Sequence, residues 1–217
     1  MTILGAFTGC FFKRSLLLLV FGVLLLSHAC SQEPILIGFS APLTGSYSDL
    51  GVQGRNGASL ALERLNEQGG VAGRKLRLLA GDDENSAQKA RQVDRDLIAN
   101  GVVAIIGHMT SAQSLAALPV ARKANVPLIS PTTSTPLLSG KKDMFFRVHA
   151  SSDRIAKALV RFAREQLGLR RINAALDSDN LAYTRPFTRD FVQSFEKHQG
   201  TVLQQCTFSS GGSTNCS

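Results

Sequence analysis

The chain has 217 residues, of which 44% are hydrophobic and 18% carry a formal charge. This composition supports a globular core and excludes a largely disordered chain. The net charge of +8 comes from basic side chains that are scattered along the chain and form no block, so the charge pattern does not indicate a nucleic-acid-binding surface.

The N-terminus has the layout of an export signal. Lys13 and Arg14 precede an apolar run at 15–26, and a small-residue step follows at 27–29. This order is typical of a secretory signal, and the apolar run is shorter than the ~20 residues of a membrane span. We therefore predict a signal peptide at 1–29 and a periplasmic protein, with a membrane anchor helix as the alternative.

The cysteines leave two questions open. Cys30 stands where bacterial lipoproteins carry their lipid, although Ser27 occupies the position that is usually Leu in such signals. Lipidation of Cys30, which would anchor the protein on the outer side of the inner membrane, and simple signal cleavage both remain possible. Export would also permit a disulfide between Cys206 and Cys216, with two free thiols as an equal alternative.

From residue 35 onward, apolar runs alternate with amphipathic runs. The apolar runs at 35–39, 76–80, 102–106 and 126–130 predict buried strands. Apolar side chains at helical spacing predict helices between them, with Ala58, Leu62 and Leu65 in the first, Ala90, Val93 and Leu97 in the second, and 111–123 forming the third. Because strands alternate with helices and hairpin signals are almost absent, we predict an α/β fold with a parallel sheet covered on both faces.

The pattern restarts after a further short strand at 145–148. A helix with Ile155 and Leu159, a strand at 171–176, a helix lined by Phe187, Phe191 and Phe195, and a strand at 202–208 follow. We place a first lobe at 31–150 and the start of a second lobe at 151–217. The Ser- and Gly-rich stretch at 209–217 is typical of a loop, and so small a second lobe would leave a sheet edge open, which predicts an incomplete second lobe and a truncated sequence.

The sequence offers little for catalysis. No pair of its histidines has metal-ligand spacing, and it has no Cys-x-x-Cys pair, nucleophile elbow or phosphate loop. The acidic run at 82–84 could suggest a metal or acid–base site, but we interpret it as a charged loop that caps a helix beginning near Ser86. We interpret Gly51, Gly54 and Gly57 as points of close packing at a helix start, and 70–75 as a turn before a strand. We predict no enzyme activity, no cofactor and no metal.

Hydroxyl-rich loops follow the third and fourth strands. The segment 107–111 leads directly into a helix, and the free N–H groups and positive dipole of that helix, with the Ser111 hydroxyl, suit a carboxylate. The Thr-rich loop at 131–136 offers carbonyl and hydroxyl oxygens to an ammonium group. The equal alternative is that Thr110 or Ser111 only caps the helix and that the second loop is a capped turn.

An ordered series of segments resembles the leucine/isoleucine/valine-binding proteins, which are type I periplasmic binding proteins of ABC transporters. The segments at 37–45, 65–75, 82–83, 106–108 and 127–131 follow the order of that family, and the resemblance covers roughly 34–208. It implies two Rossmann-like lobes, joined by three hinge crossings, that close on a ligand in the cleft. It also implies delivery of the ligand to a permease in the membrane.

The resemblance implies binding residues in the first lobe. Ser111 matches a serine that holds the ligand carboxylate, and Thr132 and Ser134 match two positions that hold the carboxylate and the ammonium group. Leu50 stands where an aromatic side chain usually covers the ligand, and Tyr47 is a nearby substitute.

The resemblance also implies one second-lobe residue and several departures. Tyr183 is a candidate for a tyrosine that contacts the ligand, although strict alignment places Leu181 there. Asn85 and Thr110 stand in place of a cysteine pair of some relatives. Because further second-lobe groups and the segment that completes the first lobe would follow Ser217, we expect weak or no binding by this chain alone.

These departures leave the ligand open. We predict a small amino-acid-like ligand, of the branched-chain type or another small amino acid, and an ABC transporter permease as partner, with no nucleic acid. The alternatives are an amide such as urea as ligand, or a sensory or receptor domain of the same fold. An α/β enzyme ranks below both because no nucleophile, metal site or phosphate loop is found.

Overall fold

The computed structural model describes residues 32–209 and 214–216. The predicted signal peptide at 1–29 and the candidate lipidation residue Cys30 lie outside the described residues. Residues from Pro34 onward group as one unit. Within the described part of the chain, no helix combines the length and the apolar character needed to cross a membrane.

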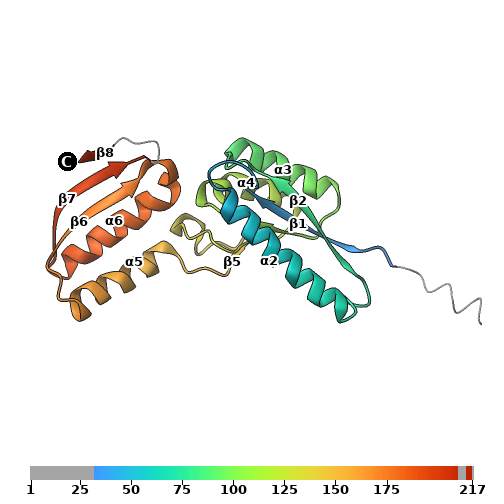
Figure 1. The fold of residues 1–217 in the computed structure, drawn as a ribbon, viewed down its shortest axis with the longest axis horizontal. Coiled ribbons are helices and arrows are strands. Elements are labelled where there is room, and N and C mark those ends of the chain that lie inside the picture. Colours follow the sequence, from blue (N-terminus) through green and yellow to red (C-terminus); the bar gives the residue numbers. More distant parts are fainter. Residues whose placement is uncertain (1–31, 210–213, 217) are drawn as a thin grey trace, which may run out of the picture. The chain divides into compact units, whose positions relative to one another are not determined.

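The first sheet is parallel throughout, as predicted (Figure 1). Its strands are β1 (Ile35–Ala41), β2 (Leu76–Asp82), β3 (Ala104–Gly107), β4 (Leu128–Ser130) and β5 (Phe145–Arg147), in the order β2-β1-β3-β4-β5. β1 is an interior strand, because Ile37 pairs with Leu78 of β2 on one side and with Ala104 of β3 on the other. This order brings the carboxyl ends of β1, β3 and β4 to one edge of the sheet.

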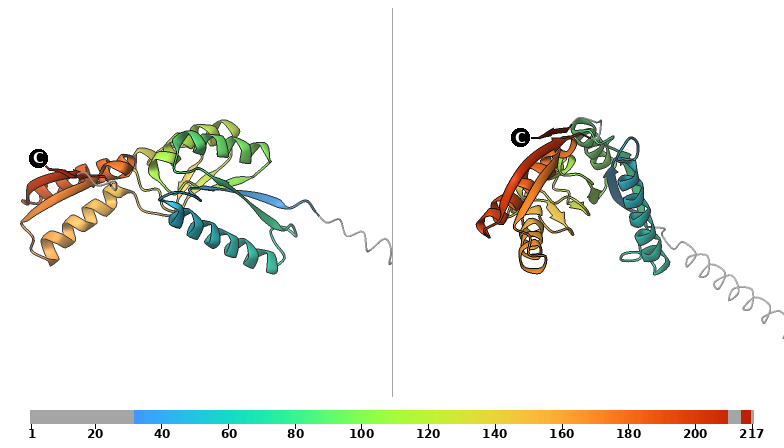
Figure 2. Two further views of the ribbon diagram at one scale, coloured as in Figure 1. Left: turned by 45° about the horizontal axis from the view of Figure 1, so that its top comes forward. Right: turned by 60° about the vertical axis from the view of Figure 1, so that its left-hand side comes forward.

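Helices cover both faces of this sheet (Figure 2). They are α2 (Ser48–Glu67), α3 (Ala87–Ala99) and α4 (Ser111–Ala124). On the α2 face, Phe39, Ala41 and Met109 form the buried cluster; on the opposite face, Leu97, Ile105 and Leu118 are part of a larger one. The prediction of a parallel sheet between two helical layers is therefore confirmed.

Two of the three glycines at the start of α2 pack closely, as predicted. A Cβ atom on Gly51 would lie 1.8 Å from the carbonyl oxygen of Pro42, and one on Gly54 would lie 2.9 Å from the Met109 side chain. The interpretation is wrong for Gly57, where a Cβ would meet nothing within 4 Å, because this residue lies further along the helix on an open face. Gly70, with φ +78°, makes the predicted turn before β2.

The second sheet begins with β6 (Arg171–Asp177) and β7 (Thr201–Phe208), which are parallel. α5 (Ser152–Arg161) continues through a π-helical turn at Phe162–Gln166, and α6 (Leu181–Lys197) packs against both strands. Val160, Ala163 and Phe195 form the buried core of this part. The predicted lobe boundary stays a prediction; β5 ends at Arg147 and α5 begins at Ser152.

The expectation of a loop at 209–217 is wrong for its last part. Thr214–Cys216 forms β8, which pairs antiparallel with β7, so the second sheet has the order β6-β7-β8 and contains one antiparallel pair. The segment has no apolar alternation, and pairing with the β7 backbone makes it a strand, which local sequence does not reveal. Cys206 is disulfide-bonded, and Cys216 lies opposite it in the register.

Candidate functional site

One pocket of about 260 Å³ lies at the carboxyl ends of β3 and β4. All six residues predicted to bind a ligand line it. The lining residues are Tyr47, Leu50, Met109, Thr110, Ser111, Thr132, Ser134, His149, Asn180 and Tyr183. The structure therefore brings together side chains that are up to 136 positions apart in the sequence.

The start of α4 contributes an uncapped helix end to this pocket. Thr110 is the N-cap residue and has an extended backbone, but its side chain makes no capping hydrogen bond. The Thr110 hydroxyl instead contacts the side chains of Gln113 and Asn85. Ser111 is the first helical residue and is 3% exposed. Thr110 therefore holds the N-cap position that the alternative expected, but its side chain makes no capping hydrogen bond, so the first-turn N–H groups can attract an anion.

The loop after β4 is held by its own hydroxyl groups. Thr132 donates a hydrogen bond from Oγ1 to the carbonyl oxygen of Met109 at 2.6 Å, so its proton is already used. Ser134 is buried, and its carbonyl oxygen accepts the N–H of Ser152 at 2.7 Å. Across the described residues, no hydrogen-bond partner is found for the hydroxyl groups of Ser111 and Ser134. The pocket can therefore offer these two hydroxyls to a ligand.

The first loop is anchored by Asp82 at the end of β2. Its carboxylate accepts the N–H of Leu43 at 2.8 Å and the hydroxyl of Thr44 at 2.6 Å. Partial burial acts to raise the pKa of Asp82, but these hydrogen bonds outweigh it and lower that pKa. The loop leads into Tyr47, whose pKa is raised by partial burial and by nearby carboxylates, so the phenol keeps its proton and can donate it.

The structure separates the two second-lobe candidates. Tyr183 lies in the first turn of α6 and lines the pocket, with its ring centroid 5.8 Å from that of Phe187. Leu181 begins the same helix but lines a different pocket. Two residues along a helix point about 200° apart, so only one of the pair can face the pocket.

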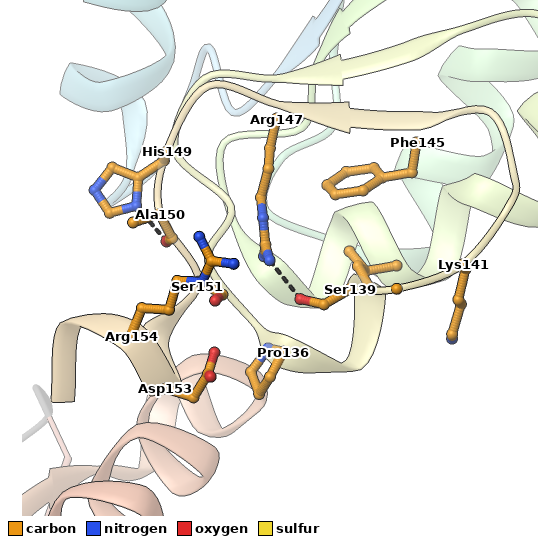
Figure 3. A pocket seen from close by; sticks show the side chains of 12 residues that line it. Pro136, Ser139, Lys141, Phe145, Arg147, His149, Ala150, Ser151, Asp153 and Arg154 are labelled. Atoms are coloured by element: carbon orange, nitrogen blue, oxygen red, sulfur yellow. Dashed lines mark hydrogen bonds between the residues drawn. The ribbon is translucent and has the colours of Figure 1, made fainter. Parts of the chain in front are cut away.

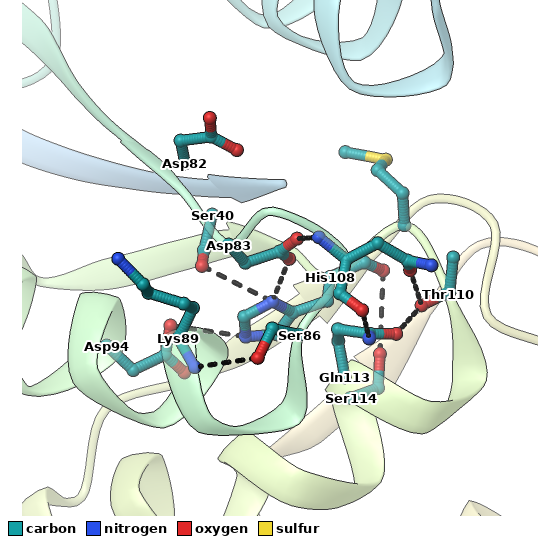
Figure 4. Close-up of polar contacts among 12 residues, drawn as sticks. Ser40, Asp82, Asp83, Ser86, Lys89, Asp94, His108, Thr110, Gln113 and Ser114 are labelled. Atoms are coloured by element: carbon teal, nitrogen blue, oxygen red, sulfur yellow. Dashed lines mark hydrogen bonds and ion pairs between the residues drawn. The ribbon is translucent and has the colours of Figure 1, made fainter. Parts of the chain in front are cut away.

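The interpretation of the acidic run as a helix-capping loop is wrong for Asp83. Asp83 is fully buried, and its Oδ2 lies 2.7 Å from Nδ1 of His108, while the Ser86 hydroxyl caps α3 (Figure 4). Asp94 on α3 lies on the other side of the ring, with Oδ1 3.2 Å from Nε2. Burial acts to lower the pKa of His108, but the two carboxylates outweigh it and raise that pKa to about 9.

Four residues that line the pocket were not among the predicted binding residues. Met109, Thr110, His149 and Asn180 line the pocket, and the first two carry a usable signal because they directly precede Ser111. Asp94 also carried a signal, since it shares the buried face of α3 with Ala90 and Leu97. Over the described ranges, no group of three or more His, Cys, Asp or Glu side chains is placed to hold a metal ion.

A second pocket of about 520 Å³ lies beside the start of α5 (Figure 3). Its lining includes Lys141, Arg147, Asp153 and Arg154. None of the predicted site residues lines this pocket. Arg147 donates hydrogen bonds to the carbonyl oxygen of Thr135 and to the Ser139 hydroxyl, so its guanidinium is engaged by the protein itself.

Comparisons with known proteins identify the family of this chain. A family model described as periplasmic binding protein matches residues 34–216. The chain belongs to this family. Together with its relatives, the match makes the chain a type I periplasmic binding protein of the leucine/isoleucine/valine-binding kind, and the predicted Rossmann-like α/β fold is confirmed.

The relatives of this periplasmic binding protein include amino-acid-binding proteins. The Leu/Ile/Val-binding protein homolog 2 of Brucella abortus (strain 2308) is 31% identical over 112 residues, which are 52% of this chain and 30% of the relative. The leucine-, isoleucine-, valine-, threonine-, and alanine-binding protein of Pseudomonas aeruginosa is 28% identical over 115 residues, 53% of this chain and 31% of the relative. The matched segments thus cover about a third of these relatives.

Solved structures of the family resemble the chain over most of its length. The leucine binding protein LivK of Thermotoga maritima superposes with a TM-score of 0.73 at 28% identity, covering 82% of this chain and 50% of that one. LivJ of Streptococcus pneumoniae, solved in complex with isoleucine, gives a TM-score of 0.74 at 26% identity, covering 82% and 51%. The chain therefore spans about half the length of these solved binding proteins.

Proposed function

We propose that this protein captures a small amino acid, with a branched-chain amino acid as the first candidate, and delivers it to an ABC transporter permease. The single observation that carries the proposal is the pocket at the carboxyl ends of β3 and β4, because it combines an uncapped helix start with free hydroxyls. The relatives that bind leucine, isoleucine and valine support the same ligand class.

The ligand carboxylate would lie at the start of α4. Ser111 offers a hydroxyl there, and the first-turn N–H groups and the helix dipole favour a negative charge. The ammonium group would lie near Ser134 and Thr132, whose oxygens accept hydrogen bonds. Tyr47 and Tyr183 would cover the ligand with their rings.

The size and lining of the pocket favour a small apolar side chain. At about 260 Å³ the pocket lies below the ~300–1,000 Å³ of sites for drug-sized ligands. Leu50 and Met109 add apolar surface beside the two tyrosines. A leucine- or isoleucine-sized ligand meets these conditions, whereas urea would leave the apolar surface uncovered.

The location follows from the same proposal. A periplasmic binding protein works outside the cytoplasm, so we propose that 1–29 is removed as a signal peptide and that the protein acts in the periplasm. Lipidation of Cys30 would keep it at the outer side of the inner membrane. Mass spectrometry of the protein purified from its host should give a mature N-terminus near residue 30, with or without a lipid mass; a retained 1–29 segment would contradict the export proposal.

A thermal-shift panel on the full-length protein tests the ligand class. Leucine at a hundred times its dissociation constant should add about 2.7 kcal/mol to the free energy of unfolding and so raise the melting temperature measurably. Leucinol lacks the carboxylate and 4-methylpentanoate lacks the ammonium group, so both should shift the melting temperature much less. A response to urea without a response to any amino acid would contradict the proposal.

A further inference from the structure

The imidazole ring of His108 lies between two carboxylates (Figure 4). Its Nδ1 is 2.7 Å from Oδ2 of Asp83, and its Nε2 is 3.2 Å from Oδ1 of Asp94. All three side chains are fully buried, with an exposed fraction of 0%. The Ser40 hydroxyl adds a contact of 3.3 Å to Nδ1.

The two carboxylates favour the charged form of the His108 ring. A neutral imidazole donates from one nitrogen and accepts at the other, so it would turn a lone pair toward one of the two carboxylates. An imidazolium donates from Nδ1 to Asp83 and places a positive charge beside Asp94. The contact with Asp94 departs from hydrogen-bond geometry, and the oxygens of Asp94 have no other partner among the described residues, so this carboxylate depends on the charge of the ring.

The backbone of His108 is also the point where the pocket loops are joined. Its carbonyl oxygen accepts the hydroxyl of Ser130 at 2.6 Å and that of Thr133 at 3.2 Å. The Met109 carbonyl accepts the hydroxyl of Thr132 at 2.6 Å, and the Thr133 hydroxyl shares its one proton between the carbonyls of His108 and Thr110, each 3.2 Å away. A shift of His108 would therefore move both loops that line the pocket.

We propose that the buried cluster of Asp83, His108 and Asp94 is a positioning element for the ligand pocket. None of the three side chains lines the pocket, so they act through the backbone at 108–110 and not by touching the ligand. The cluster ties the loop after β3 to the β2–α3 connection and to α3, and so holds Ser111 in place for a carboxylate. The part of this inference that concerns ligand binding rests on the proposed function. The part that concerns the position of the loop after β3 rests on the structure alone.

Few titratable groups of the described residues surround the His108 ring, so the interactions of the cluster depend mainly on the charge of the ring. Within the described part of the chain, the titratable groups against the ring are Asp83 from the β2–α3 connection and Asp94 from α3. β1 contributes the hydroxyl of Ser40, and the hydroxyls of β4 and α4 face the His108 carbonyl. Asp82 is turned to the first loop, and Glu84 pairs with Lys89 on the exposed side.

The test compares Asp94→Asn with Leu118→Ala in the full-length protein, using leucine as the probe ligand. Leu118 lies in the apolar cluster of α3 and α4 and lines no part of the pocket, so its truncation controls for a general loss of stability. At a temperature where both variants are folded, Asp94→Asn should weaken leucine binding at least tenfold, and Leu118→Ala should leave it within twofold. Equal affinities of the two variants would overturn the proposal.

A second measurement needs neither a variant nor a ligand. Hydrogen exchange of the wild-type protein should show that the protection of amides at 109–111 and 133 falls as the pH rises through about 9, while the amides of β1 keep their protection. Uniform protection at all pH values would overturn the positioning role even if leucine binds. Loss of loop protection without any leucine binding would leave the positioning role standing and contradict the proposed function instead.

Discussion

Raising the pH from 6 to 9.5 should destabilise this protein through one residue, His108. The folded state raises the pKa of this side chain from 6.5 to about 9, because Asp83 and Asp94 favour its charged form more than burial disfavours it. A group with a raised pKa stabilises the fold fully below its unfolded pKa and loses that contribution as the pH rises through the folded one. The window is therefore about pH 6.5 to 9.

The magnitude follows from the same shift. At about 1.4 kcal/mol for each pKa unit, a rise of about 2.5 units corresponds to a loss of roughly 3 kcal/mol across the window. That is a large part of the ~5–15 kcal/mol by which proteins of this kind are usually stable. The lowered pKa values of Asp82 and Asp153 and the raised pKa of Tyr47 act below pH 4 and above pH 10, outside the window.

Urea unfolding at constant ionic strength, in steps of half a pH unit, measures the effect. Asp94→Asn is the matched control, because removing one of the two charges lowers the pKa of His108 and moves the loss of stability to lower pH. The reasoning is refuted if the wild-type free energy of unfolding stays level between pH 6.5 and 9. It is also refuted if the variant and the wild type follow parallel curves.

Three further predictions concern the ligand, the packing and the disulfide. Ser111→Ala should weaken leucine binding by about 1.5–3 kcal/mol in calorimetry of the full-length protein, the usual contribution of a hydrogen bond to a charged group; unchanged binding would make the site assignment wrong. Gly51→Ala should destabilise the fold by about 1–3 kcal/mol, because a Cβ there would lie 1.8 Å from a backbone oxygen, whereas Gly57→Ala should stabilise it by up to about 1 kcal/mol. Equal urea midpoints for the two variants would contradict this. Peptide mapping without reductant should find Cys206 joined to Cys216, and two free thiols would contradict this disulfide.

Much of the fold follows from local patterns in the sequence. The apolar run at the start of β1 and the helical spacing of Ala90, Val93 and Leu97 predicted elements that the structure contains. β8 could not be predicted in this way, because its residues are polar and small and become a strand only by pairing with β7. The π-helical turn after α5 likewise has no marker in the sequence.

Part of the pocket could be predicted from the sequence, namely the hydroxyl-bearing residues that follow neighbouring parallel strands. Ser111 and Thr132 follow strands whose carboxyl ends meet at one edge, so the strand order alone brings them together. Tyr183 could not be separated from Leu181 by sequence, because the choice depends on where α6 begins after the 3₁₀ turn at Ser178–Asn180. The spacing of Asp94 places it on the buried face of α3, but the reason for a buried carboxylate there is seen only once His108 lies against it.

The central claim is that an amino acid carboxylate binds at the start of α4. A crystal structure of the full-length protein with leucine tests it most directly. We predict that a carboxylate oxygen lies within 3.2 Å of Oγ of Ser111 and faces the first-turn N–H groups of α4, with the ammonium group toward Ser134. Leucine bound away from this pocket, or bound there with its ammonium group at Ser111, would contradict the account.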